Sequence, residues 1–404
     1  MDPSAANLGS TLGPLAGSAL TGLFWASATT VTYAYAAYPL LVRGLAGAFG
    51  HDDVSPPIDR ARLPRVALVI AAHNEAAVID ERIRNALELD YPADRLEIII
   101  ASDGSDDGTV EACRPHEPRV RILDFRQRRG KAATLNAAFE EVDAEIVVLS
   151  DANTMMGRES LLRLVRWFAD PDVGVVCGRL VLRELGSGRN ADGAYWRFET
   201  FLKRCEGRLG GLLGANGAIY AMRRELVAPL PRGTVVDDFV LPLLAKIASD
   251  CRIIYDQDAL AFEETAPTVG CEFRRRARIG VGGFQALWIL RRLLNPLRGW
   301  TAFTFWSHKV LRWLCPFCML IALGTSAALA ASEPYRAAFL LQVAFYLAAA
   351  LVASLPDNWR VTRRLRILPM FVWMNVALLI GFVRFVRGGH GGIWKRTARL
   401  QDCG

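Results

Sequence analysis

The sequence predicts an α/β fold in which a mixed, mostly parallel β-sheet carries helices on both faces and is joined to transmembrane helices. Between Arg65 and Asn153, short apolar runs that suit buried strands alternate with helical patterns. This short-period alternation is typical of a doubly wound sheet. Outside this block, long windows carry no charged residue, although 22% of the chain is charged.

Four uncharged windows predict membrane segments, at residues 3–42, 313–332, 337–356 and 367–383. A helix needs about 20 apolar residues to cross the hydrocarbon core, so the first three are long enough and the fourth is marginal. The predicted organisation is an N-terminal transmembrane helix (1–50), a large central block (51–283), amphipathic interface helices (284–308), a C-terminal transmembrane region of about three segments (309–388) and a basic tail (389–404).

The charges beside these windows predict an orientation. Arg43, Arg60, Arg62 and Arg65 follow the first window, and positive residues stay in the cytoplasm. We therefore expect an integral protein of a bacterial inner membrane with its central block in the cytoplasm. Four full crossings would put the C-terminus outside, whereas the basic tail favours the cytoplasm. We favour a cytoplasmic tail, which requires that one segment does not cross.

Composition argues against several other functions. The net charge of +7 comes with Arg residues that stand beside membrane segments, where they suit anionic lipid, and no nucleic-acid recognition motif is present. The 8 Cys residues are scattered, which argues against a disulfide framework. Cys315 and Cys318 lie in an apolar helical pattern with too few ligands for a zinc site.

Polar side chains gather where the predicted strands end. Asn74 and Glu75 follow the first strand, Asp103 ends the second, and Asp151 and Asn153 follow the apolar run 146–150. Open α/β sheets bind ligands beyond the carboxyl ends of their strands. Alternate residues of an extended chain point the same way, so the last two side chains can face one ligand. Their oxygens suit Mg²⁺ or Mn²⁺ carrying a diphosphate. Capping of a following helix is the alternative role.

The second half of the central block adds a glycine-rich loop, an acidic pair and an arginine-rich helix. The loop spans 210–217, and Asp237 and Asp238 begin a predicted helix. One carboxylate there is explained by capping and the helix dipole, but two exceed that need. Residues 271–283 contain four Arg residues, and 288–306 mix Arg with Trp, Leu and Phe. The latter composition fits a helix in the membrane interface.

Taken in order, these motifs resemble the membrane-embedded family 2 glycosyltransferases, the group of cellulose, hyaluronan and poly-N-acetylglucosamine synthases. The likeness covers roughly residues 64–320, and the ordered set is specific although each motif alone is weak. It implies a GT-A type fold for residues 51–283 and inverting, metal-dependent hexosyl transfer from a UDP-sugar.

The resemblance also implies roles for individual residues. Donor-side positions are Ala72, Asn74 and Glu75 of the first motif, Asp103 at the nucleotide base, Lys131, Arg275 and Arg278 near the diphosphate, and Asp151 with Asn153 at the metal. Acceptor-side positions are Gly214, Asn216 and Gly217. The catalytic pair is Asp237 and Asp238, of which Asp238 is the expected base.

Two positions depart from the family pattern. Asn153 stands where the family has the second Asp of Asp-x-Asp, which lowers the charge at the metal but keeps an oxygen ligand. The family's Gln-x-x-Arg-Trp motif appears here as Arg275 to Ile279. An aliphatic side chain lacks the flat face that stacks on a sugar ring, so processive synthesis is in question while glycosyl transfer is not.

Several alternatives remain open at this level. The acceptor is a growing polysaccharide or a lipid-linked hydroxyl, and the helices form a glycan conduit or only anchor the catalytic block beside membrane lipid. A chain that adds one sugar to a lipid carrier is the main alternative, and an inactive nucleotide sensor is the other. No feature of the sequence identifies a partner subunit, the sugar or the linkage.

Overall fold

The computed structural model describes residues 14–183, 194–264, 269–356 and 365–388. One eight-stranded sheet has the order β3-β2-β1-β4-β7-β6-β8-β5. Strands β1 to β4 pair in parallel, whereas β7 is antiparallel to both β4 and β6, and β5 is antiparallel to β8. The strands are β1 (Val66–Ala72), β2 (Leu96–Asp103), β3 (Arg121–Phe125), β4 (Ile146–Asp151), β5 (Met155–Met156), β6 (Val173–Arg183), β7 (Tyr220–Arg223) and β8 (Arg252–Glu264).

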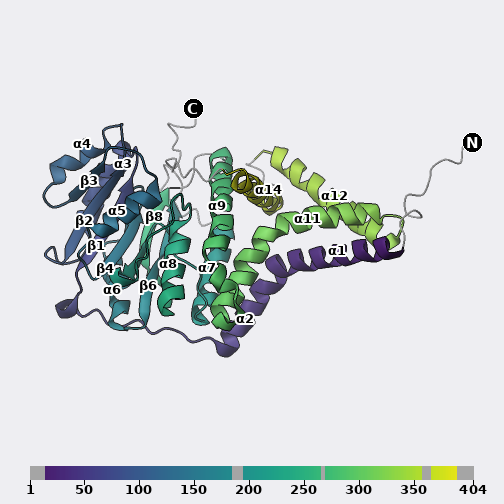
Figure 1. Cartoon of the computed structure of the whole chain (residues 1–404), viewed down its shortest axis with the longest axis horizontal. Helices are drawn as coiled ribbons and strands as arrows, with labels where there is room; N and C mark the ends of the chain where they lie inside the picture. The colour runs from purple at the N-terminus through teal and green to yellow at the C-terminus, as the bar shows by residue number, and fades with distance from the viewer. Residues whose placement is uncertain (1–13, 184–193, 265–268, 357–364, 389–404) are drawn as a thin grey trace, which may run out of the picture.

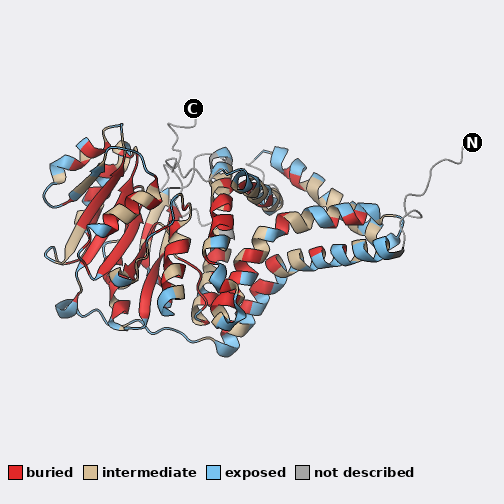
Figure 2. Ribbon diagram, in the orientation of Figure 1, coloured by how far each residue is buried: buried red, intermediate tan, exposed pale blue. Residues whose placement is uncertain are grey.

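Helices cover both faces of the sheet because the central strands are apolar on both sides. In β1, Leu68 and Ile70 pack on one face, and Ala67 and Val69 pack on the other. The first face is covered by α3 (Ala76–Leu87), α4 (Thr109–Cys113) and α6 (Ser160–Val165), and the second by α5 (Lys131–Glu140), α8 (Asp237–Ser249) and the end of α9 (Val269–Ile289). The buried strands form the centre of this domain (Figure 2).

Helix α9 stands between the sheet and the apolar helices (Figure 1). The remaining helices are α1 (Pro14–Thr32), α2 (Tyr38–Phe49), α7 (Ala194–Arg208), α10 (Gly299–Thr304), α11 (Leu311–Ala328), α12 (Glu333–Ser354) and α14 (Ile367–Val386). Single π-helical turns join α1 to α2 and α10 to α11. These two turns meet where Tyr33 Oη lies 2.9 Å from Ser307 Oγ.

Three helices of the described residues are long and apolar enough to cross a membrane: 296–328, 333–354 and 367–386. They coincide with the last three predicted windows, including the marginal one. The N-terminal helix is not among them, because its Gly, Ser and Thr residues dilute its apolar content. It lies beside α11 (Figure 1). Leu15 and Trp25 are exposed on it, and its crossing of a membrane stays a prediction.

The interface region differs from the predicted layout. The expected boundary at 283/284 lies inside α9, and residues 291–298 form two short turns rather than part of one amphipathic helix. Pro296 explains the interruption, since proline cannot donate a backbone hydrogen bond and restricts the residue before it. Trp288 and Leu297 are exposed there. The basic tail at 389–404 lies outside the described residues.

Buried polar contacts attach the helical region to the sheet domain. Glu206 of α7 is 1% exposed and accepts hydrogen bonds from Tyr38 Oη at 2.7 Å and from His308 Nδ1 at 2.6 Å. These three residues come from α7, α2 and the π-helical turn before α11. Phe305 and Val310 also belong to the core on the second face of the sheet. The first apolar helix (296–328) and the sheet domain therefore share one packed interior.

The crossing of α9 and α14 makes Gly381 a sensitive position. A Cβ at Gly381 would lie 2.8 Å from the carbonyl carbon of Gly280, so a side chain there must push the two helices apart. We expect Gly381→Val to lower the free energy of unfolding by about 1–3 kcal/mol and to displace the arginines of α9. Thermal unfolding in detergent measures the effect. Gly324→Val in α11 is the control, because nothing lies within 4 Å of that Cβ position; equal melting temperatures of the two variants would contradict the prediction.

Candidate functional site

The carboxyl ends of β1, β2 and β4 bring several predicted site residues to one edge of the sheet. Ala71 is paired with Asp151 of β4, and Ala72 with Ser102 of β2. Asp103 follows at the end of β2. Asn74 comes shortly after the end of β1. Its φ of 56° is positive, and the chain turns away from the sheet there. The topology alone thus gathers side chains from segments far apart in the sequence.

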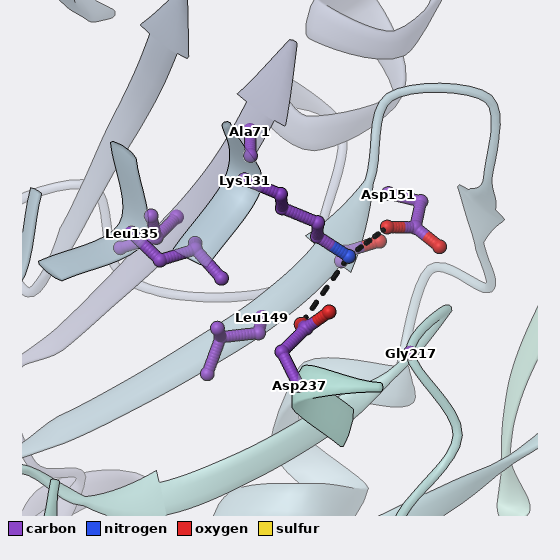
Figure 3. Close-up of a pocket in the computed structure, with 9 residues that line it drawn as sticks. Ala71, Lys131, Leu135, Leu149, Asp151, Gly217 and Asp237 are labelled. Atoms are coloured by element: carbon purple, nitrogen blue, oxygen red, sulfur yellow. Dashed lines mark hydrogen bonds and ion pairs between the residues drawn. The ribbon is translucent and has the colours of Figure 1, made fainter. Parts of the chain in front are cut away.

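A lysine and two carboxylates form the centre of the site. Lys131 Nζ lies 2.9 Å from Asp151 Oδ1 and 3.2 Å from Asp237 Oδ2 (Figure 3). Lys131 begins α5 directly after Gly130, while Asp237 begins α8. Two helix starts from opposite halves of the domain therefore point at the end of β4.

Gly217 lies between Asp238 and Asp151. Its backbone N–H donates to Asp238 Oδ2 at 3.0 Å. A Cβ at this position would lie 3.3 Å from Asp238 Oδ2 and 3.5 Å from Asp151 Oδ2. The two carboxylates thus approach the same glycine from two sides, and a residue without a side chain leaves the space between them open.

Burial and charge shift the ionisation of this cluster. Burial raises the pKa of Asp237 from 3.8 to about 6, against the opposing effect of Lys131. Burial by itself would lower the pKa of Lys131, but Asp151 and Asp237 raise it above its usual value. For Arg278, burial and then the nearby Arg275 lower the pKa. The site thus favours the charged form of Lys131 and makes Asp237 easier to protonate.

The raised pKa of Asp237 predicts a pH-dependent stability. Because the pKa is higher in the folded chain than in an unfolded one, the group's contribution to stability is complete below about pH 4 and is lost as the pH rises through about 6. Asp237→Asn removes this loss. We expect the stability of the variant relative to the unchanged protein to rise by about 3 kcal/mol between pH 4 and pH 8. Melting curves at both values test this, and a difference independent of pH would contradict it.

Asp103 holds the turn that leads into Lys131. The Asp103 side chain is fully buried and accepts backbone N–H groups of Arg129 at 2.7 Å and of Gly130 at 3.0 Å. Gly130 has a φ of 87°, which favours glycine. Asp103, which is predicted to contact the nucleotide base, therefore shapes the turn before Lys131, which is predicted to lie near the diphosphate.

The first motif is tied to the loop after β2. Asn74 Nδ2 donates to Asp106 Oδ1 at 2.8 Å, and Asn74 Oδ1 accepts from the backbone N–H of Asp106 at 3.0 Å. The backbone N–H of Glu75 donates to Thr109 Oγ1 at 2.8 Å. These contacts lock the two loops together above the ends of β1 and β2.

The glycine-rich loop is held from three sides. Asn216 Nδ2 donates to the carbonyl of Gly178 at 2.7 Å, and Lys203 donates to Asn216 Oδ1. Gly214 has a φ of 72°, and a Cβ there would lie 2.9 Å from the Phe239 ring. The predicted acceptor-side residues therefore lie directly beside the start of α8.

The predicted metal ligands offer oxygen donors but no complete cage. Asp151 presents a partly exposed carboxylate, and the side chain of Asn153 donates through Nδ2 to Glu263 Oε1 at 3.1 Å. Among the described residues, no group of three or more His, Cys, Asp or Glu side chains is placed to hold a metal ion. Magnesium with a nucleotide commonly uses one or two protein oxygens and completes its shell with phosphate and water. The donor set therefore fits such a metal.

The arginine-rich helix reaches this site from α9. Arg275 Nη1 lies 3.3 Å from Glu272 Oε2, and Arg276 Nε lies 2.6 Å from Glu272 Oε1. Arg278 is close enough to Asp151, Asp237 and Asp238 for their charges to act on its pKa. The structure thus brings Arg278 toward the carboxylates, while Arg275 pairs with a residue of its own helix.

Three further residues at the site were not identified from the sequence. Glu263 lies at the end of β8, and Lys203 contacts the glycine-rich loop. Arg82 is completely buried, and two of its nitrogens have no hydrogen-bond partner among the described residues. Its Nη1 donates to Asn85, which in turn holds the backbone of Met156 just after the Asp151 turn. Burial lowers the pKa of Arg82 to about 10.

Comparisons with known proteins relate part of the chain to one enzyme family. Residues 67–228 match the family described as glycosyl transferase family 2. The chain is 26% identical over 265 residues to beta-monoglucosyldiacylglycerol synthase of Synechocystis, an alignment that covers 63% of this chain and 55% of that protein. It is 25% identical over 240 residues to poly-beta-1,6-N-acetyl-D-glucosamine synthase of Staphylococcus aureus, covering 57% of this chain and 58% of the synthase. The chain thus spans little more than half the length of these curated relatives.

A solved structure is similar over almost the whole chain. It is a mannosyltransferase of Pyrobaculum calidifontis in complex with GDP-mannose and Mn²⁺, with a TM-score of 0.67 and 25% identity, and the match covers 94% of this chain and 99% of the other. The likeness confirms the predicted GT-A type fold. Residues 67–228 therefore form a glycosyltransferase family 2 domain, in a chain that also carries three helices apolar enough to span a membrane.

Proposed function

We propose that the chain transfers a sugar, with inversion, from a nucleotide-diphosphate donor to a polysaccharide or lipid-linked hydroxyl at the cytoplasmic face of a membrane. The observation that carries the proposal is the cluster at the end of β4, where Lys131 bridges Asp151 and Asp237 while Asp238 faces Gly217. The site thus combines the fixed positive charge of Lys131 with the carboxylate of Asp238, which takes no part in the ion pairs of Lys131 with Asp151 and Asp237.

In the proposed reaction, the acceptor hydroxyl attacks the anomeric carbon from the side opposite the diphosphate. The bond from that carbon to the phosphate oxygen breaks, and the hydroxyl proton passes to the Asp238 carboxylate. Lys131 and Arg278 stabilise the negative charge on the departing nucleotide diphosphate. Asp151 and Asn153 would hold Mg²⁺ or Mn²⁺, which supplies further neutralisation of that leaving group.

Two donors are candidates. A UDP-sugar follows from the resemblance to the polysaccharide synthases, and GDP-mannose follows from the similarity over 94% of the chain to a mannosyltransferase that binds it. The acceptor is likewise a choice between two classes, since one relative is named as a glycolipid synthase and the other as a polysaccharide synthase. Ile279, in place of an aromatic residue, favours the addition of single sugars.

Nucleotide release by the detergent-purified full chain tests the proposal. The donors are a panel of UDP- and GDP-sugars, each with Mn²⁺, Mg²⁺ or EDTA, in the presence of a bacterial lipid extract or short glycans. We expect one donor to release its nucleotide, EDTA to abolish the release and the product to have the opposite anomeric configuration. Binding of nucleotide without turnover of any donor would favour the inactive sensor instead.

A further inference from the structure

The side chain of Asn153 is held by a carboxylate from the other end of the sheet. Asn153 Nδ2 lies 3.1 Å from Glu263 Oε1. Strand pairing brings the two together, because β5 is antiparallel to β8 with Met155 opposite Phe262. The turn between β4 and β5 therefore runs alongside Glu263, and both side chains are partly buried.

This contact determines how the Asn153 amide is oriented. An ionised carboxylate only accepts hydrogen bonds, so the amide must direct its NH₂ group toward Glu263. Its Oδ1 is then the end of the amide that does not face Glu263. The hydrogen-bonding chemistry, rather than the similar shape of the two amide ends, thus fixes which atom faces the site.

The same contact explains the charge balance at the site. In the family pattern, two aspartates contribute two negative charges, whereas Asp151 and Asn153 contribute one. Glu263 would supply the second negative charge in direct contact with Asn153; burial raises the pKa of Glu263, while the charge of the nearby Arg275 opposes that effect. An aspartate at 153 would place two carboxylates at the 3.1 Å separation of the present pair, which like charges disfavour. Asn153 and Glu263 are thus chemically matched to each other.

We propose that Glu263 is a positioning residue of the metal–diphosphate site, which turns Asn153 Oδ1 toward the ligand and supplies the negative charge absent from position 153. This proposal rests on the metal-dependent transfer proposed above. It makes the pair Asn153–Glu263 the local equivalent of the family's second aspartate. Exchanging the two side-chain types, as in Asn153→Asp with Glu263→Gln, should then preserve the arrangement, because a glutamine amide donates to an aspartate.

Binding of Mn²⁺ in the presence of UDP, and in a second series of GDP, tests this by electron paramagnetic resonance without any need for turnover. We expect Glu263→Ala to weaken Mn²⁺ binding by about 10–100-fold and the exchanged double variant to bind within about threefold of the unchanged protein. Glu264→Ala is the matched control, since Glu264 is the exposed neighbour on the same strand, and its affinity should not change. Equal Mn²⁺ affinity of Glu263→Ala and the unchanged protein would overturn the proposal.

Thermal unfolding without metal gives an independent readout. Asn153→Asp alone should lower the melting temperature at pH 8 through repulsion from Glu263, and adding Glu263→Gln should restore it. An unchanged melting temperature of Asn153→Asp would refute the pairing, whatever the metal does. If the unchanged protein binds no Mn²⁺ with either nucleotide, the metal-dependent function fails and the metal role of Glu263 with it. If the unchanged protein binds Mn²⁺ but the variants do not show the expected Mn²⁺ affinities and melting temperatures, the proposed role of Glu263 fails and the metal-dependent function stands.

Discussion

Asp238→Asn should lower sugar transfer by roughly 10²–10⁴-fold, the usual effect of losing a general base, while nucleotide affinity stays nearly unchanged. Asparagine keeps the shape of the side chain and one oxygen, so the N–H of Gly217, now 3.0 Å from Asp238 Oδ2, retains an acceptor. The groups expected to hold the diphosphate, Lys131 and Arg278, are untouched. Turnover at saturating donor and acceptor, together with calorimetric nucleotide binding, measures the two effects separately.

Asp250→Asn provides the matched control for this experiment. Asp250 follows the other end of α8, where its side chain is 79% exposed and pairs only with Lys246 among the ion pairs of the described residues. Its φ of 55° suits asparagine as well as aspartate. We expect transfer by this variant to match that of the unchanged protein. Full activity of Asp238→Asn would remove Asp238 from the proposed role, and equal losses in both variants would point to general damage to α8.

The parallel half of the fold could be predicted because its signals are local. Each of β1, β2 and β4 is an apolar run that ends in polar residues, and the rule that ligands bind at the carboxyl ends of parallel strands then places Asp103 and Asp151 on one edge. The approach of Lys131 to Asp151 follows from the same topology, since α5 leads directly into β4. The order of these segments along the chain and the spacing of their apolar residues were enough to predict this half of the sheet.

The other half of the sheet, in which β6 and β8 pair in parallel and the other pairs are antiparallel, was harder to predict because its signals are long-range. β8 contains Asp256 and Asp258, which interrupt the apolar pattern. Asp256 is nevertheless buried, because Trp167 and Arg166 each donate a hydrogen bond to it at 2.7 Å. The neighbours that make a buried aspartate acceptable lie about ninety residues away in the sequence. Glu263 was missed for the same reason, since its contact with Asn153 depends on the pairing of β5 with β8.

Lys131→Met should both destabilise the protein and reduce transfer. The substitution leaves the Asp237 side chain, which is 7% exposed, beside Asp151 without its cation. Removing one partner of a buried ion pair costs about 3–5 kcal/mol, and losing a fixed charge at the leaving group lowers turnover by about 10²–10³-fold. Thermal unfolding and transfer rates measure the two losses.

A second variant separates the structural role of Lys131 from its catalytic one. In Lys131→Met with Asp237→Asn, the buried carboxylate is neutral, so most of the lost stability should return. Transfer should stay well below that of Asp237→Asn alone, because no positive charge replaces the ammonium group near the leaving diphosphate. If the double variant recovered transfer along with stability, Lys131 would serve only to neutralise Asp237. If the single variant were as stable as the unchanged protein, the contacts of 2.9 Å and 3.2 Å that place Lys131 between the two carboxylates would contribute no net stability, and its presence there would have to be explained by the donor alone.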